Sequence, residues 1–276
     1  MIASSLYKLV EPAEDDSQTG NIAVIEIEDI ILDSLPVLDQ IDKIRKSTEF
    51  KAVIVRVNSP GGAVGAAQEI FLALKKLREK IPVIVSMGDL AASGGLYVSM
   101  AGHTIVALPG TLTGSMGVLL ELTNLSRLMD RIYIDPVTIR SGDLKDAGNP
   151  TRPLDPKAKQ YFQQLIDRNF EEFRDTVKTE RKLTDEVVKT LSDGRVIDGK
   201  QAVEWKLVDE LGTFEDAVDR AKERGEIKGD VSLAWLSRKP KGLVERVLHE
   251  SVAPIHQWMK SKTRILEYRF DPHSLR

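Results

Sequence analysis

The sequence predicts an α/β fold with a largely parallel sheet, followed by a helical extension. Short β-branched runs alternate with helical periodicity up to Ser141, and the chain is then highly charged and helical in its periodicity. It shows no internal repeat, and no Pro- or Ser-rich linker precedes residue 225. We therefore expect a flexible N-terminal segment at 1–21, one domain over 22–225, and a C-terminal tail at 226–276 that is partly amphipathic and basic.

The expected strands are short apolar segments. The first, IAVIEIE at 22–28, alternates apolar and acidic side chains, as a strand with one solvated face does. The others are continuous apolar runs, which are typical of strands buried on both faces. They are AVIVRV at 52–57, PVIVSM at 82–87, TIVAL at 104–108 and IYIDPVTI at 132–139.

Helices are expected where apolar residues recur every three or four positions. The segment 64–80 shows this pattern, with Ile70, Leu74 and Leu77 on one face and charged residues on the other. A long, highly charged stretch at 156–181 also keeps its apolar residues on one face. The remaining expected helices are 36–46, 186–191, 199–205 and 213–224.

Composition excludes several kinds of chemistry. The 276 residues contain no cysteine, which rules out disulfides, thiolate metal sites and a cysteine nucleophile. The 39 Lys and Arg residues are balanced by 42 Asp and Glu residues, whereas a protein that binds nucleic acid usually shows a basic excess. We therefore expect no nucleic-acid partner, no metal and no cofactor.

The sequence shows no secretory signal and no membrane span. The stretch from Leu90 to Leu120 lacks charged residues, but its many Gly, Ser, Thr and Pro residues fit a buried, tightly turned region better than a helix in lipid. We expect a protein of the cytoplasm or of the membrane periphery. The basic, amphipathic residues of 238–269 are a candidate for peripheral membrane contact, with a subunit contact or a packed end of the fold as the alternative.

Two glycine-rich turns follow predicted strands and lead into predicted helices. They are NSPGG at 58–62 and AASGG at 91–95. Backbone amides from two such turns can form an oxyanion hole. Ser93 stands at a strand-to-helix turn between small residues, where a nucleophile elbow places its serine. The alternative is a pair of tight turns with Ser93 as an ordinary helix N-cap.

A serine nucleophile needs a base, and histidine is scarce. Three of the four histidines crowd the C-terminal tail, and His103 fits a packed or surface residue. Lysine is the other candidate base. Lys145 differs from the lysines on helix faces because it lies in SGDLKDAGNPTRPL, a loop rich in Gly and Pro. The alternative is a solvated surface lysine.

Four motifs in this order, NSPGG, AASGG, TGSMG around Ser115 and SGDLKDAGNPTRPL, resemble the signal peptide peptidase A family of serine proteases. The resemblance implies a ClpP/crotonase-like fold of repeated β-β-α and βαβ units. It also implies Ser93 as the nucleophile, Lys145 as the general base and Ser115 as the residue that positions the lysine. The implied oxyanion hole is formed by Gly61, Gly62 and Gly94.

By the same resemblance, the protein is a serine endopeptidase that cleaves remnant signal peptides and other small hydrophobic peptides through an acyl-enzyme. The family also implies a homo-oligomer, expected as an octamer, in which neighbouring subunits share the serine and the lysine.

Two alternatives remain open. A crotonase-like acyl-CoA enzyme would share the fold but needs a positioned carboxylate, for which Asp89 and Asp146 are the nearest acids. A non-catalytic, ring-forming scaffold needs neither dyad residue, so the presence of both Ser93 and Lys145 favours the peptidase. A Ser-His-Asp triad is disfavoured, because no suitable histidine follows Ser93.

The expected lysine base sets the pH dependence of the activity. Lysine accepts a proton only as the neutral amine, so we expect hydrolysis to rise from neutral to alkaline pH. Initial rates on a fluorogenic hydrophobic peptide across that range measure this, and a rate maximum at acidic pH would contradict the expectation.

Overall fold

The computed structural model describes residues 20–236 and the strand 267–269. Nearly all of the expected N-terminal segment, and the tail except for 226–236 and 267–269, lie outside the described residues. The strands are β1 Ile22–Glu28, β2 Ala52–Ser59, β3 Gly61–Ala63, β4 Val83–Ala92, β5 Thr104–Ala107, β6 Leu112–Gly114, β7 Val196–Asp198, β8 Glu210–Leu211, β9 Leu233–Trp235 and β10 Glu267–Arg269. The helices are α1 Leu35–Lys46, α2 Val64–Arg78, α3 Gly94–Ser99, α4 Ser126–Arg131, α5 Pro156–Arg181, α6 Asp185–Leu191, α7 Gly199–Glu204 and α8 Phe214–Arg224.

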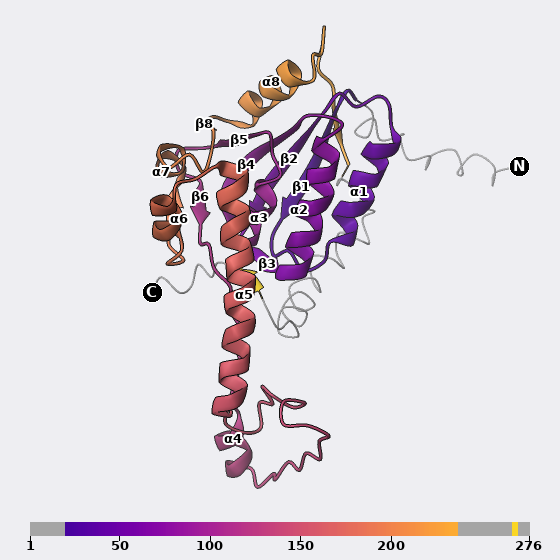
Figure 1. Ribbon diagram of the computed structural model, residues 1–276. Coiled ribbons are helices and arrows are strands. Elements are labelled where there is room, and N and C mark those ends of the chain that lie inside the picture. Colours follow the sequence, from indigo (N-terminus) through magenta and orange to yellow (C-terminus); the bar gives the residue numbers. More distant parts are fainter. Residues whose placement is uncertain (1–19, 237–266, 270–276) are drawn as a thin grey trace, which may run out of the picture.

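The main sheet has the strand order β7-β6-β4-β2-β1-β9 (Figure 1). Its pairs are parallel except for β6 with β7, so the sheet is mixed. Strand β4 pairs with β2 along one edge, and along the other edge first with β5 and then with β6. The predicted α/β class is confirmed. The sheet also includes residues beyond 225, because β9 pairs with β1.

Side chains of the central strands alternate between two cores. Ala23, Ile25 and Ile27 of β1 belong to the core on the side of α1, α2 and α3, whereas Ile22 and Val24 contact the smaller core beneath α8. This alternation follows from the two-residue period of a strand. Because both faces are covered by helices, the central strands are apolar along most of their length, as the sequence predicts for 52–57 and 82–87. The solvated face expected for 22–28 is wrong at Ile22–Ile25, which are fully buried, because α8 covers that face of the sheet; only Glu28 of this strand is exposed.

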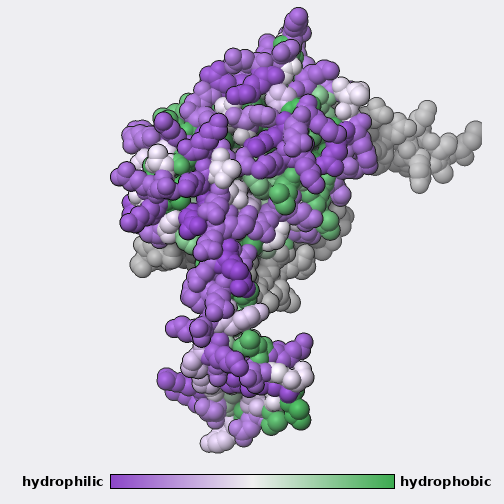
Figure 2. All heavy atoms as spheres, in the orientation of Figure 1, coloured by the Kyte–Doolittle hydropathy of each residue, from purple (hydrophilic) through white to green (hydrophobic). Residues whose placement is uncertain are grey.

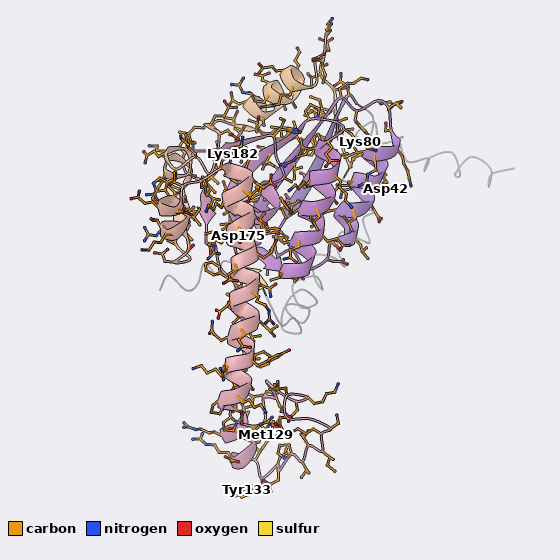
Figure 3. All side chains as sticks on the ribbon, viewed as in Figure 1. Asp42, Lys80, Met129, Tyr133, Asp175 and Lys182 are labelled. Atoms are coloured by element: carbon orange, nitrogen blue, oxygen red, sulfur yellow. The ribbon has the colours of Figure 1, made fainter. Side chains whose placement is uncertain are left out.

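Helix α5 projects away from the sheet (Figure 1). Its C-terminal half packs on the body of the protein, where Phe173 and Val177 are fully buried. Its N-terminal half carries α4 and the connecting loops well away from the sheet, around the labelled residues Met129 and Tyr133 (Figure 3). We call residues 119–165 the arm.

The strand expected at 132–139 is wrong. These residues follow α4 on the arm and pair with no strand in the described parts of the chain. Strand propensity reflects packing against neighbouring strands, and Pro136 has no backbone N–H to donate to a ladder. Tyr133 and Ile139 are 95% and 96% exposed instead, so the apolar pattern of this segment has no partner within the described chain.

The arm is anchored through Tyr97 of α3. The Tyr97 ring lies edge-on between Phe71 of α2 and Phe173 of α5, with both pairs of ring centroids 5.1 Å apart. Its hydroxyl donates a hydrogen bond to Glu172. Burial, together with that carboxylate, raises the pKa of Tyr97, so the hydroxyl stays protonated and continues to donate.

A second contact lies nearer the C-terminal end of α5. Glu180 accepts hydrogen bonds from Lys75 and Arg78 of α2, both at 2.6 Å. Burial opposes ionisation of Glu180, but these two hydrogen bonds outweigh it and lower the pKa of the carboxyl group. The charged network therefore persists at neutral pH and fixes the direction of α5.

We predict that Phe173→Ala destabilises the protein strongly, whereas Tyr161→Ala on the exposed half of α5 does not. Phe173 is fully buried, and truncating such a ring costs about 3–5 kcal/mol in the free energy of unfolding. Tyr161 is 40% exposed, so its loss leaves no comparable cavity. Urea unfolding, monitored by fluorescence, measures the free energy of unfolding of both variants. Equal losses of stability would show that Phe173 does not anchor α5.

Candidate active site

The predicted site residues other than Lys145 gather where β2, β4 and β6 end. Ser59 at the end of β2 pairs with Ala91 of β4, and Ala92 at the end of β4 pairs with Gly114 at the end of β6. The turns that follow these three strands are therefore neighbours. The carboxyl ends of parallel strands, with helix N-termini beside them, are the usual place for a binding site in such folds.

Ser93 occupies a strained turn between β4 and α3. Its backbone has φ 53° and ψ −115°, and its side chain makes no capping hydrogen bond to the helix. Its backbone N–H donates to the carbonyl of Gly114 at 2.9 Å, and the residue is 1% exposed. Such a conformation costs about 1–3 kcal/mol and concentrates at functional sites. The geometry matches a nucleophile elbow and lacks the side-chain bond of an ordinary N-cap.

Ser115 lies beside this turn. It directly follows Gly114, whose carbonyl accepts the Ser93 N–H, and it too has a positive φ, of 50°. Its own N–H donates to the carbonyl of Arg195 at 2.7 Å, and its side chain is half-buried. The structure thus brings the two predicted serines to adjacent positions.

The three predicted oxyanion glycines differ in their surroundings. All three are buried. Gly61 has φ 98° and donates its N–H to Ser59 Oγ at 3.1 Å, so that amide is already engaged. A Cβ on Gly62 would lie 2.1 Å from the carbonyl oxygen of Ile31, so only glycine fits there. Gly94 begins α3, directly after Ser93.

Lys145 is not near Ser93 in the same chain. It is exposed and lies in a turn of the arm, two residues from Asp143, which forms an ion pair with Lys157 at the start of α5. Helix α3 packs against α5 at Phe173, seventeen residues beyond Pro156, which corresponds to roughly 25 Å along the helix axis. The loop between α4 and α5, which carries Lys145, therefore lies on the far part of the arm (Figure 1).

An ionic cluster shapes the loop that carries Lys145. Arg140 and Arg152 both bind the carboxylate of Asp146, and their hydrogen bonds lower the pKa of Asp146 to about 2. Asp146 is therefore fully ionised at neutral pH and engaged in the loop. Asp89, the other acid considered for an acyl-CoA enzyme, is exposed on β4.

His103 lies at the wrong end of the sheet to serve Ser93. It precedes β5, and its Nδ1 accepts a hydrogen bond from the N–H of Val83 at the start of β4. Burial and the nearby Arg224 and Arg78 lower its pKa. Ser93 follows the other end of β4, a strand of ten residues that spans roughly 30 Å. A polar hollow of about 760 Å³ lies beside His103, so it too is distant from Ser93.

Residues 20–236 and 267–269 contain neither a candidate metal site nor a candidate membrane span. No group of three or more His, Cys, Asp or Glu residues there is arranged to hold a metal ion. Within the same residues, every helix is too short or too polar to cross a bilayer. The amphipathic segment expected in the tail lies almost wholly outside the described residues.

Comparison with known proteins identifies the family. The model of "Peptidase family S49" matches residues 75–228, more than half of the chain. The chain belongs to peptidase family S49. The S49 chain also matches a Clp protease model over residues 24–113, the part that runs from within β1 into β6. The predicted ClpP-like fold and the resemblance to signal peptide peptidase A are confirmed.

Two curated relatives agree with this assignment. The S49 chain is 42% identical over 199 residues to "Putative protease slr0021" of Synechocystis, covering 72% of each chain. It is 36% identical over 204 residues to "Serine protease SPPA, chloroplastic" of Arabidopsis thaliana, covering 73% of this chain but 30% of that protein. A solved ClpP1 variant of Listeria monocytogenes aligns with a TM-score of 0.47 at 16% identity, over 74% of this chain and 95% of that one. The S49 chain is a serine peptidase, as the sequence predicts.

Sequence reasoning missed one residue that shapes the site. Gly95 lies in the first turn of α3, and a Cβ there would lie 2.7 Å from the carbonyl oxygen of Ser59. The motif AASGG held the signal, because its second glycine lies beyond the turn at Ser93 and Gly94 and therefore needs another reason to be glycine. Its role is close packing, which brings the start of α3 against the end of β2.

We predict that Gly95→Ala lowers kcat/KM for peptide hydrolysis at least tenfold, about 1.4 kcal/mol in the barrier, because the added methyl displaces the turn that presents Ser93. Gly65→Ala is the matched control, since Gly65 also lies in the first turn of a helix but has open space around its Cα. The control should keep full activity and gain about 0.4–1 kcal/mol in stability. Steady-state kinetics and thermal unfolding test both variants, and full activity of Gly95→Ala would show that this contact is not needed.

Proposed function

We propose that this S49 peptidase cleaves remnant signal peptides and other small hydrophobic peptides with a dyad of Ser93 and Lys145. The observation that carries the proposal is the strained backbone of Ser93, whose side chain makes no capping hydrogen bond to α3. Ser93 directly follows β4, at the edge of the sheet where the neighbouring strands β2 and β6 also end. We expect the enzyme to act in the cytoplasm or at the membrane surface.

The first chemical step is attack of Ser93 on the peptide carbonyl. Neutral Lys145 Nζ takes the hydroxyl proton as Oγ bonds to the carbonyl carbon. The developing oxyanion is held by backbone amides, for which Gly62 and Gly94 are the candidates, because the Gly61 N–H already donates to Ser59 Oγ. The lysine then returns the proton to the departing amine, leaving an ester on Ser93.

Hydrolysis of the ester repeats these roles with water as the nucleophile. Lys145 takes a proton from water, the same amides hold the second oxyanion, and Ser93 Oγ leaves with the proton. The Ser115 hydroxyl would accept a hydrogen bond from the lysine amine or donate one to it. This contact would fix the orientation of the amine toward Ser93. The position of Ser115 beside the Ser93 turn supports this role.

The dyad must be completed by two copies of the chain. Within one copy the lysine lies on the arm, roughly 25 Å along α5 from the helix contact beside Ser93. An arm that projects from the body can instead bring its lysine to the serine of a neighbour. We propose that neighbouring subunits of a closed ring, expected as an octamer, share the site in this way.

The exposed surface of the arm supports such a contact. Apolar side chains gather at its free end (Figure 2), and those that are at least half exposed are Leu128, Ile132, Tyr133, Ile134, Val137 and Ile139. Contiguous exposed apolar side chains commonly mark a protein interface. Burying them against a neighbouring copy would also give the unpaired segment 132–139 a partner.

The shared dyad predicts complementation between two inactive variants. Ser93→Ala and Lys145→Ala should each abolish turnover of a fluorogenic hydrophobic peptide. When they are co-expressed with different tags and purified through both, we expect about a quarter of the wild-type activity, because that share of neighbouring pairs retains one intact serine and one intact lysine.

Two outcomes would contradict this proposal. If the mixed assembly stays inactive while light scattering shows an intact ring, the dyad is not shared between copies. If the wild type does not hydrolyse peptides, or Ser93→Ala remains active, the scaffold or the acyl-CoA alternative gains support.

A further inference from the structure

The amine of Lys145 is free although an acidic residue stands on each side of it. Asp146 follows Lys145 directly, and Asp143 precedes it by two positions. Within the described parts of the chain, Lys145 Nζ makes neither a hydrogen bond nor an ion pair, because both acids bind other cations. A lysine paired with a carboxylate is held in its charged form, which cannot act as a base. The occupation of the two acids therefore matters for the proposed chemistry.

Asp146 is bound by two arginines, one on each side of Lys145 in the sequence. Arg140 donates from Nη1 to Oδ1, and Arg152 donates from Nη2 to Oδ1 at 2.9 Å and from Nε to Oδ2 at 3.1 Å. Two hydrogen bonds from one guanidinium fix its orientation as well as its distance. The Asp146 side chain is 13% exposed, whereas Lys145 is exposed. The carboxylate thus joins the two ends of the loop and leaves the lysine side chain outside the ionic cluster.

Backbone hydrogen bonds extend this cluster to the residues around Lys145. The carbonyl of Asp146 accepts a hydrogen bond from the N–H of Asn149 at 3.1 Å and a longer one from Arg152 Nη2 at 3.4 Å. The N–H of Lys145 donates to the carbonyl of Gly142 at 3.1 Å. Together these contacts fix the backbone from which the lysine side chain extends.

We infer that Asp146 is a positioning residue for the reaction: bound by the two arginines, it presents Lys145 as a free amine in a defined place. The inference rests on the proposed function, in which Lys145 is the base. A displacement of about 1 Å in a reacting group can cost about a hundredfold in rate. The loop lies on the arm, so the ionic cluster gives Lys145 the support that packing in the body gives Ser93.

Removing the carboxylate tests the inference, with Asp143 as the matched control. Asp143 also lies beside Lys145, but its ion pair with Lys157 joins side chains that are 72% and 66% exposed, and such surface pairs contribute little. For Asp146→Ala we expect kcat for a fluorogenic hydrophobic peptide to fall at least about tenfold with KM unchanged, because the lysine acts in the chemical steps and not in peptide binding. Asp143→Ala should keep the wild-type kcat.

A mixed assembly separates positioning of the lysine from folding. In an assembly of Ser93→Ala and Lys145→Ala chains, every shared active site takes its lysine from the Ser93→Ala copy. We expect Asp146→Ala to lower the activity at least about tenfold when it is added to the Ser93→Ala chain, and to leave it unchanged when it is added to the Lys145→Ala chain. Loss of folding or of assembly would affect both placements alike, so equal activities would overturn the inference.

The outcomes also distinguish this inference from the proposed dyad. A wild-type kcat in Asp146→Ala, where Lys145→Ala is inactive, would overturn the inference and leave the dyad standing. An active Lys145→Ala variant would contradict both. If the mixed assembly is inactive before Asp146→Ala is added, sharing of the dyad alone is contradicted, and the comparison of kcat with Asp143→Ala decides the inference.

Discussion

The contact between Gly95 and the carbonyl of Ser59 holds the candidate site together. It allows the first turn of α3 to reach the end of β2, which lies beside β4 in the sheet. Ser93, Gly94 and Gly62 become neighbours only because this helix and this strand approach so closely. The strained backbone of Ser93 is stabilised by the same arrangement, since its N–H is held by Gly114 on the other side of β4.

The rest of the molecule divides into a packed body and the projecting arm, and contacts in the body fix the direction in which the arm projects. Tyr97 and Glu180 fix the C-terminal half of α5 through aromatic packing and through hydrogen bonds to α2 and α3. Everything N-terminal to that contact projects outward, including the loop of Lys145. The ion pairs of Asp146 with Arg140 and Arg152 give that loop a defined shape in the absence of a packed core.

The sequence predicted local structure well where the partners of a segment lie within the same chain. The periodicity of 64–80 and 156–181 located α2 and α5 correctly, and the turn at Ser93 was recognised from the small residues around it. It failed at 132–139, because a β-branched run indicates a strand only if another strand lies beside it. The pairing of β10 with β3 was not foreseen, since contact across some two hundred residues leaves no local pattern. The separation of Ser93 from Lys145 within one chain was implied only by the family resemblance, because it depends on where α5 is anchored and no local pattern records that.

Because the serine lies on the body and the lysine on a projecting arm, the activity of the protein in the cell would depend on its assembly. Under the proposed dyad, a single copy carries half of a catalytic site and is inert. A chain that has just left the ribosome therefore cannot cut its neighbours, and no propeptide is needed to restrain it. Activity would appear only above the concentration at which copies assemble, so expression level itself would act as the switch, and dilution would turn the enzyme off.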